Sequence, residues 1–314
     1  MISVVIPIHN EEANIPLLLA RLKSVMDALE RPYEIVCVDD GSTDRSLEML
    51  LQALRENPNL KVVELTRNYG QHPAVMAGFS QSKGEIVITI DADLQNPPEE
   101  IPRLVKTMEE GNYEVVGTVR RARKDSYFRV LASKAINILT RRITGIKMSD
   151  WGCMLRAYRQ SVVEKMVAYA EQATFVPALA TVFAKRITEI EVAHEERHGG
   201  KTNYPLRKLI NLQFDLVSSF SNLPLKVLLY GGIIMSFLGF AFGLTLIIAR
   251  LYFGAAWAVQ GVFTLFALLF FFIGMQFFAL GVLGEYLDRI YREVRKRPSF
   301  VIQKVYQAKG EGRP

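Results

Sequence analysis

The chain has 314 residues, and its 38 lysines and arginines against 32 aspartates and glutamates give a formal net charge of +6. Half of the residues are hydrophobic, which excludes a disordered chain because that much apolar surface can form a core. The two cysteines, Cys37 and Cys153, are too few for a disulfide framework and favour a reducing compartment. A basic chain of positive mean hydropathy meets either nucleic acid or a membrane.

Short β-favouring runs alternate with helical patterns over the first 120 residues. Strands are expected at residues 3–8, 33–38, 61–65, 85–90 and 113–118, and helices at 13–29, 46–55, 74–80 and 100–110. This alternation predicts an α/β fold with a mostly parallel sheet and helices on both faces. Ligands bind such sheets beyond the carboxyl ends of the strands. Three polar loops follow strands, at residues 7–12, 39–44 and 91–95, and are expected to share one edge of the sheet.

The loop after residue 90 carries two carboxylates, Asp91 and Asp93, and Gln95 lies two residues further on. Oxygen ligands of this kind suit Mg²⁺ or Mn²⁺, which would bridge to a diphosphate. Neither a dinucleotide fingerprint nor a Walker loop is present to hold phosphates in another way. A lone Asp-x-Asp is often a solvated turn, but the preceding β-favouring residues 86–90 make a metal site the better interpretation here.

The loop after residue 38 carries a second acidic pair, Asp39 and Asp40. One carboxylate could accept hydrogen bonds from a ribose or a base, with Asp40 preferred. Alternatively the loop caps the next helix through Ser42, Thr43 or Asp44, and both can hold if Asp44 caps and Asp40 binds. Arginines suit phosphate contacts, and the candidates are Arg120, Arg129, Arg156 and Arg197.

Two long runs without charged residues, 227–249 and 251–284, dominate the C-terminal third. A membrane span needs about 20 apolar residues, so two transmembrane helices are expected at about 225–249 and 259–283. A buried hairpin of a soluble protein is the alternative. The resulting division is a catalytic domain at 1–205, an amphipathic juxtamembrane segment at 206–224, the hairpin at 225–284, and a juxtamembrane helix and tail at 285–314.

Lysines and arginines flank the hairpin on both sides, while its short loop offers only Arg250. The positive-inside rule therefore places the catalytic domain and both termini in the cytoplasm, as a multi-pass protein of the bacterial inner membrane. The chain opens on an apolar strand, so no signal peptide is expected. Basic residues beside anionic lipid account for much of the charge without nucleic acid.

Four motifs in series, at residues 3–11, 38–44, 91–95 and 150–156, resemble family 2 glycosyltransferases of the GT-A fold. The resemblance is strongest to the polyprenyl-phosphate branch, which has a C-terminal transmembrane hairpin. Within that branch, residues 67–72, 91–103 and 152–158 look most like transferases of 4-deoxy-4-formamido-L-arabinose.

The resemblance implies site residues motif by motif. Nucleotide contacts fall on a set from all three polar loops: Pro7, His9, Glu11, Val38, Asp40, Asp91 and Ala92. Asp91, Asp93 and Gln95 would hold the metal, and Asp93 and Asp150 would be catalytic, with Asp150 on the acceptor side. Phosphate and acceptor contacts fall on Arg120, Arg129, Arg197 and Lys201. Relatives usually have Tyr in place of His9, and their phosphate-loop Lys corresponds to Asn203. Either Lys201 takes the phosphate instead, or this loop binds differently.

The implied reaction is metal-dependent, inverting transfer from a UDP-sugar to undecaprenyl phosphate, with UDP-4-deoxy-4-formamido-L-arabinose as the preferred donor. Its product would supply a lipid-linked sugar for modification of lipid A or the cell envelope. UDP-glucose as donor, a dolichyl-phosphate-mannose-synthase-like enzyme, and a non-catalytic membrane partner stay open as alternatives. A processive polysaccharide synthase is disfavoured, because its Gln-x-x-Arg-Trp signature is missing. Relatives imply a homotetramer.

Overall fold

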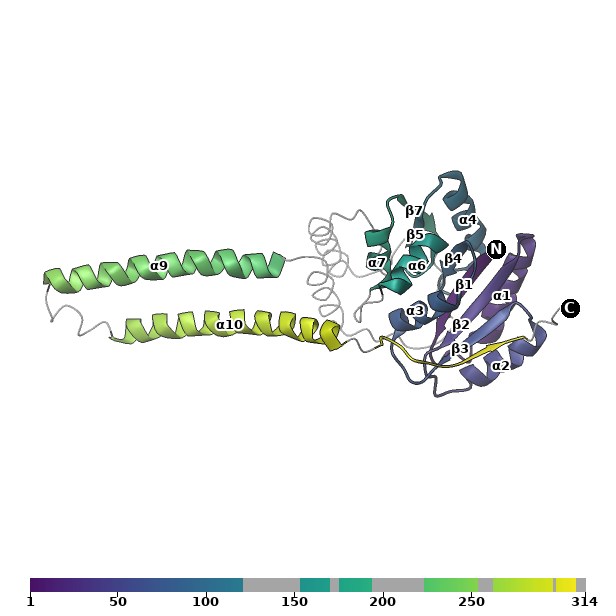
Figure 1. Cartoon of the computed structure of the whole chain (residues 1–314), viewed down its shortest axis with the longest axis horizontal. Coiled ribbons are helices and arrows are strands. Elements are labelled where there is room, and N and C mark those ends of the chain that lie inside the picture. The colour runs from purple at the N-terminus through teal and green to yellow at the C-terminus, as the bar shows by residue number, and fades with distance from the viewer. Residues whose placement is uncertain (121–152, 170–174, 194–222, 254–261, 296–297, 309–314) are drawn as a thin grey trace. The chain divides into compact units, whose positions relative to one another are not determined.

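A computed structural model of the protein describes residues 1–120, 153–169, 175–193, 223–253, 262–295 and 298–308. The chain divides into two compact units (Figure 1), one holding a sheet with its helices and the other two long helices. The elements of the first unit are β1 (Ile2–Ile8), α1 (Ile15–Ala28), β2 (Tyr33–Asp39), α2 (Ser46–Glu56), β3 (Leu60–Leu65), α3 (Gln71–Gln81), β4 (Ile86–Thr89), the 3-10 turn η1 (Pro98–Glu100), α4 (Ile101–Glu110), β5 (Val115–Arg120), β6 (Arg156–Arg159), α6 (Gln160–Ala168), α7 (Val176–Phe183), β7 (Ile187–Val192) and β8 (Ile302–Gln307).

The sheet has eight strands in the order β7-β5-β6-β4-β1-β2-β3-β8. Its centre is parallel, since β1 pairs with both β2 and β4, and β2 pairs with β3. β6 and β8 are antiparallel to their neighbours. The predicted α/β class is confirmed, and the five strands expected in the first 120 residues are all present. The sequence patterns did not predict β6, β7 or β8.

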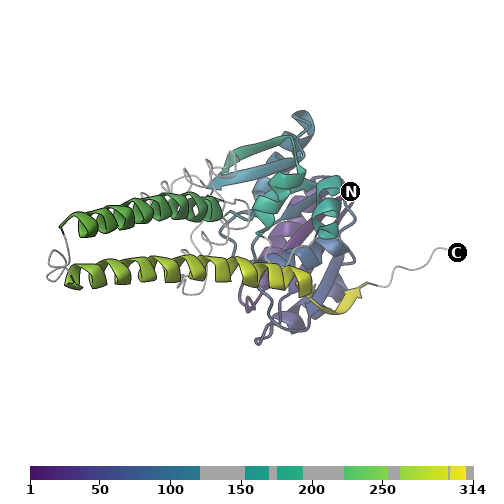
Figure 2. The same cartoon turned by 60° about the vertical axis from the view of Figure 1, so that its left-hand side comes forward.

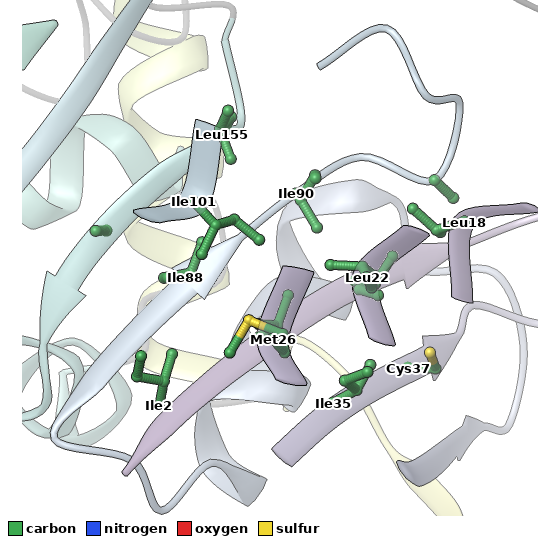
Figure 3. Packing of buried hydrophobic residues seen from close by; sticks show 14 of the residues in the cluster. Ile2, Leu18, Leu22, Met26, Ile35, Cys37, Ile88, Ile90, Ile101 and Leu155 are labelled. Atoms are coloured by element: carbon green, nitrogen blue, oxygen red, sulfur yellow. The ribbon is translucent and has the colours of Figure 1, made fainter. Parts of the chain in front are cut away.

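Helices cover both faces of the sheet, as expected for strands whose residues are buried on both sides. On one face the core contains Leu18, Leu22 and Met26 of α1 packed with residues of α2, α4 and the central strands. Figure 3 shows α1 lying over Ile35 and Cys37 of β2 and Ile88 of β4. The other face is covered by α3, α6 and α7. The parallel centre of the sheet is therefore fixed from both sides.

Helix α3 packs especially close to the sheet. A Cβ added at Gly78 would lie 2.3 Å from Cγ1 of Val5 on β1 and 3.1 Å from Cγ2 of Val38 on β2. Only a residue without a side chain allows this approach. The close packing fixes α3 against β1 and β2.

A largely buried ion pair lies at the amino end of the strands. The Glu34 carboxylate accepts hydrogen bonds from Oγ of Ser3 at 2.6 Å, the Lys83 amide at 2.6 Å and Nζ of Lys61 at 2.9 Å. Burial alone would raise the pKa of Glu34, but the bonds from Ser3, Lys61 and the Lys83 amide outweigh it, so the pKa lies below the ordinary value. Glu34 therefore favours folding in its ionised form.

We expect Glu34→Gln to lower the melting temperature of the detergent-purified protein at pH 7. A hydrogen bond to a charged group is worth about 1.5–3 kcal/mol. Because the folded-state pKa of Glu34 is depressed, its contribution is complete above the unfolded pKa of about 4.3 and is lost as pH falls through the folded pKa. The difference from wild type should then shrink below about pH 4.

The matched control is Glu48→Gln, because Glu48 of α2 forms an exposed pair with Arg45, which precedes the helix. That variant should change the melting temperature much less. Equal melting of the Glu34 variant and wild type at pH 7, or a difference that persists in acid, would contradict this account.

The second unit consists of α9 (Leu223–Phe253) and α10 (Val262–Arg295). Within α9, Leu228–Phe253 is long and apolar enough to cross a membrane by length and composition, and none of the searched segment is buried. A shorter apolar stretch, Phe271–Gly284, lies in α10. The two helices run side by side (Figures 1 and 2), and a Cβ on Gly239 would lie 3.9 Å from the Phe272 ring. This arrangement is consistent with the expected hairpin.

The strand β8 follows this helix pair in sequence and pairs with β3 at the edge of the sheet. Val305 is partly buried and packs against the hydrophobic cluster that includes the buried residues of α3, and the Tyr306 hydroxyl donates to Oε2 of Glu64 at 2.7 Å. The amide of Thr66 donates to the carbonyl of Val301 at 3.1 Å. The chain thus leaves the first unit before α9 and rejoins the same sheet after α10. If the chain between these two points crosses a membrane, it must cross an even number of times, because both points belong to the same folded unit.

Candidate active site

The loops after β1 and β2 form one hydrogen-bonded structure. Oδ1 of Asn10 accepts the amide of Thr43 at 2.8 Å, and the amide of Asn10 donates to Oγ of Ser42 at 3.1 Å. The amide of Glu11 donates to Oγ of Ser46 at 2.9 Å. Asp44 accepts the amide of Ser46, the first residue of α2, at 2.9 Å. Asp44 therefore binds the start of α2 as predicted, and the two loops share one edge as expected.

His9 joins the first loop to the residues before α3. Its Nδ1 lies 3.0 Å from the Asp40 carbonyl, and its Nε2 lies 3.0 Å from Nδ2 of Asn68. A carbonyl only accepts, so Nδ1 carries the proton, and Nε2 accepts from the Asn68 amide. Both nitrogens of the ring are thus engaged with protein groups. His9 lies at the predicted edge and is held in one orientation.

The carboxylate of Asp40 is engaged with the backbone. It accepts the amide of Tyr69 at 2.7 Å and that of Gly70 at 2.8 Å, and the residue is 3% exposed. Burial raises the pKa of this carboxyl, and the two amide bonds act against that rise. In the structure Asp40 fixes the loop before α3, a role that the sequence did not indicate.

The side chain of Asp39 points to the opposite face of the sheet from that of Asp40, because successive residues along a strand alternate between the two faces. Oδ2 of Asp39 lies 3.4 Å from the Ser42 amide, whereas its buried Oδ1 has no hydrogen-bond partner among the described residues. Burial raises the pKa of Asp39, the Ser42 bonds oppose that rise, and nearby Glu64 adds to it. A buried acceptor without a partner is costly unless a ligand supplies the donor. The sequence favoured Asp40 as the carboxylate that binds a ribose or a base, but two adjacent aspartates in a sequence cannot be distinguished in this respect.

Gly41 lets two loops approach each other at backbone distance. It has φ +62°, and a Cβ there would lie 2.5 Å from the carbonyl carbon of Arg67 and 2.5 Å from the nitrogen of Asn68. Both contacts are to backbone, which cannot rotate away as a side chain can. The position of the residues around Asp40 and before α3 thus depends on a glycine here.

The third acidic loop follows β4 at the same edge. Asp91 accepts Nε2 of Gln71 at 2.6 Å, and Oδ1 of Asp93 accepts the Gln95 amide at 3.2 Å. Leu94 has φ +61° and is fully buried, so its side chain anchors the loop in the core. All three acidic loops are therefore connected, the third through the start of α3.

The donor set of this loop fits a hard divalent cation. Two carboxylates, on Asp91 and Asp93, lie on one short turn, which is the type of ligand that Mg²⁺ and Mn²⁺ take. Within the described residues no group of three or more His, Cys, Asp or Glu could hold a metal. Such an ion would complete its coordination with substrate phosphates and water, as Mg²⁺ commonly does.

The other predicted site residues have different positions. Pro7 and Val38 are paired across β1 and β2, and the Val38 side chain is buried in the core, as is that of Ala92. Contact of Val38 or Ala92 with a ligand would therefore involve mainly backbone atoms. Glu11 accepts Nδ2 of Asn14 at 2.6 Å. Arg120 ends β5.

Four of the predicted site residues lie outside the described residues: Arg129, Asp150, Arg197 and Lys201.

Arg156, a candidate for phosphate contact, is fully buried on β6, and its Nε donates to the Cys153 carbonyl at 2.7 Å. Burial and the charge of Arg156 lower the pKa of His72 to about 4, so His72 is neutral near pH 7. The His72 ring contacts Phe175 edge to face, with centroids 4.8 Å apart. Arg156 therefore belongs to the packed layer between the sheet and α3.

Comparison with known proteins shows the family of the chain. Residues 3–200 match the family described as Glycosyl transferase family 2. The chain is 54% identical to the undecaprenyl-phosphate 4-deoxy-4-formamido-L-arabinose transferase of Photorhabdus laumondii, over 97% of this chain and 94% of that protein. The protein of the same name from Proteus mirabilis is 54% identical, over 98% and 94%. Among solved structures, glucosyl-3-phosphoglycerate synthase from Mycobacterium tuberculosis covers 70% of this chain and 80% of its own, with 21% identity and a TM-score of 0.49.

Proposed function

The chain belongs to glycosyl transferase family 2, and on this premise we propose that it transfers a sugar from a UDP-sugar to undecaprenyl phosphate. The proposed donor is UDP-4-deoxy-4-formamido-L-arabinose. The observation that carries the proposal is 54% identity to transferases of that name over 97% of the chain. The joined acidic loops at the carboxyl edge of a parallel sheet support it, because that edge is where such sheets bind nucleotides.

The nucleoside would be held between the first two loops. Oδ1 of Asp39 is the acceptor available to a base N–H, because Asp40 already binds two backbone amides. The His9 ring lies beside them, fixed through both nitrogens. We therefore assign base recognition to Asp39 and loop geometry to Asp40. Glu11 and Pro7 complete the same edge.

The diphosphate would lie over the third loop. Asp91 and Asp93 would hold Mg²⁺ or Mn²⁺, with Gln95 as a further ligand, and a bound cation would neutralise charge that develops on the leaving diphosphate. Arg120 and Arg129 are assigned to the acceptor phosphate or the diphosphate, and Arg197 and Lys201 to phosphate, as the resemblance implies. These positive charges would offset the repulsion between the donor diphosphate and the acceptor phosphate, and they would hold the two anions close together.

The nucleophile needs little activation. A phosphate monoester is largely ionised at neutral pH, since its second pKa is about 6. Asp150 is therefore assigned to orienting the acceptor or the donor sugar more than to removing a proton. A single displacement by the lipid phosphate inverts the anomeric carbon and releases UDP.

The helices α9 and α10 would anchor the enzyme in the membrane that contains its lipid acceptor. The return of the chain to the sheet at β8 supports an even number of crossings, as in a two-helix hairpin. The lysines and arginines that flank the hairpin favour a cytoplasmic catalytic unit. Residence in the inner membrane and assembly into a tetramer belong to the same proposal.

Release of UDP tests this function. The detergent-purified full chain is incubated with UDP-4-deoxy-4-formamido-L-arabinose and Mn²⁺, with or without undecaprenyl phosphate. The proposal expects UDP release that requires the lipid and the cation. Equal release without lipid would indicate a hydrolase, and no release under any of these conditions would contradict the proposal.

A further inference from the structure

The start of α3 contacts two of the acidic loops at once. The amide of Gly70, which precedes the helix, donates to Oδ2 of Asp40 at 2.8 Å. The next residue, Gln71, donates from Nε2 to Oδ1 of Asp91 at 2.6 Å. Two successive residues thus connect the loop at residues 39–44, here called the nucleoside loop, to the loop at residues 91–95 that is assigned to the cation.

This connection is held in place by packing. Ala74, Val75 and Phe79 of α3 are buried against the sheet, and Gly78 allows the helix its close approach to β1 and β2. The Ala74 amide donates to the Gly70 carbonyl at 3.1 Å. This hydrogen bond closes the first turn of α3, which contains Gln71. The Gln71 side chain therefore extends from a fixed point, although it is itself exposed.

We propose that Gln71 is a positioning residue that sets the orientation of the Asp91 carboxylate for the cation and diphosphate. The inference rests on the proposed function, because it assumes that Asp91 is a ligand. A hydrogen bond to one oxygen of a carboxylate limits its rotation, and the bond from Gln71 places such a restraint on Oδ1 of Asp91. An amide is well suited to the task because it donates a hydrogen bond without bringing a positive charge that would repel the cation.

The partners that orient metal-binding side chains matter for affinity. Their removal typically weakens metal binding or activity by 10-fold to 100-fold, roughly. Loss of the Gln71 bond should therefore weaken the cation without unfolding the protein, since an exposed residue at a helix start contributes little to the core.

The test replaces Gln71 with methionine, which keeps the length of the side chain and its helix propensity but removes the donor. Gln81→Met is the matched control, because Gln81 ends the same helix about 15 Å away. Binding of Mn²⁺ to the full chain in the presence of UDP is followed by electron paramagnetic resonance. We expect Gln71→Met, and likewise Gln71→Ala, to weaken Mn²⁺ by about 10-fold or more at unchanged melting temperature. Gln81→Met should bind Mn²⁺ as wild type does.

A third variant, Asp91→Asn, separates the inference from the function on which it rests. If Asp91→Asn loses Mn²⁺ binding while Gln71→Met and Gln71→Ala bind as wild type does, Gln71 does not position Asp91, and the proposed function stands. If Asp91→Asn also binds Mn²⁺ as wild type does, the assignment of Asp91 fails, and the role of Gln71 fails with it.

Discussion

Replacing Asp91 or Asp93 with asparagine is expected to lower kcat/KM for sugar transfer by at least about 100-fold. A metal ion supplies several kcal/mol of stabilisation to developing charge, and each 1.4 kcal/mol is about tenfold in rate. Asparagine keeps the size of the side chain and removes the negative charge that binds the cation. Turnover is measured as lipid-dependent UDP release by the detergent-purified protein.

The control for these variants is Asp27→Asn. Asp27 is exposed near the end of α1 and accepts a hydrogen bond from the hydroxyl of Tyr33, the first residue of β2. It therefore lies near the amino ends of the strands, whereas the acidic loops follow their carboxyl ends. Its replacement should leave turnover unchanged. Near-normal turnover of both Asp91→Asn and Asp93→Asn would show that the loop at residues 91–95 is not part of the active site.

The second large effect is expected from Gly41→Ala. The new Cβ would lie 2.5 Å from two backbone atoms of Arg67 and Asn68, so one of the loops must move. Positive φ adds a penalty of about 1–2 kcal/mol for a residue with a side chain. Because Asp40 binds the amides of Tyr69 and Gly70, displacement disturbs the nucleoside loop and the start of α3 together.

We expect Gly41→Ala to weaken UDP binding, measured by calorimetry, by about tenfold or more, which corresponds to about 1.4 kcal/mol. The melting temperature should fall as well. Gly243→Ala in α9 is the control, because a Cβ there meets nothing within 4 Å. Unchanged UDP affinity and melting of Gly41→Ala would show that the contact between the loops is not needed.

The first 120 residues were largely predictable because each element has its own local pattern. Strands such as β1 and β2 are short apolar runs, and the acidic loops come directly after them. The parallel pairing of β1 with β2 and β4 then brings those loops to one edge. A single sequence could therefore locate the candidate site before its contacts were known.

The strands β6 and β8 were not predictable from local pattern. β6 has only four residues, two of them arginines, and β8 is six residues of mixed polarity after a long helix. Each exists because a neighbouring strand supplies hydrogen bonds, β4 and β5 for the first and β3 for the second. Their formation depends on contacts between distant parts of the chain, which periodicity does not contain.

The division of work within the site was also hidden. The sequence shows Asp39 and Asp40 as an adjacent pair, whereas the structure gives Asp40 two backbone amides and leaves Oδ1 of Asp39 without a partner in the described part of the chain. The motif at residues 67–72 contains Gln71, but the sequence assigned this residue no role, because its contact is to a residue twenty positions away. Both assignments depend on where loops meet in space.

The mass of the lipid product shows which sugar the enzyme transfers. The full chain in detergent is given undecaprenyl phosphate, Mn²⁺ and an equimolar mixture of UDP-4-deoxy-4-formamido-L-arabinose and UDP-glucose, and lipids are read by mass spectrometry. We expect wild type to form undecaprenyl phosphate that carries one 4-deoxy-4-formamido-arabinosyl residue, and we expect this product to be absent with Asp93→Asn. A product that carries only glucose, or no glycosylated lipid at all, would contradict this expectation.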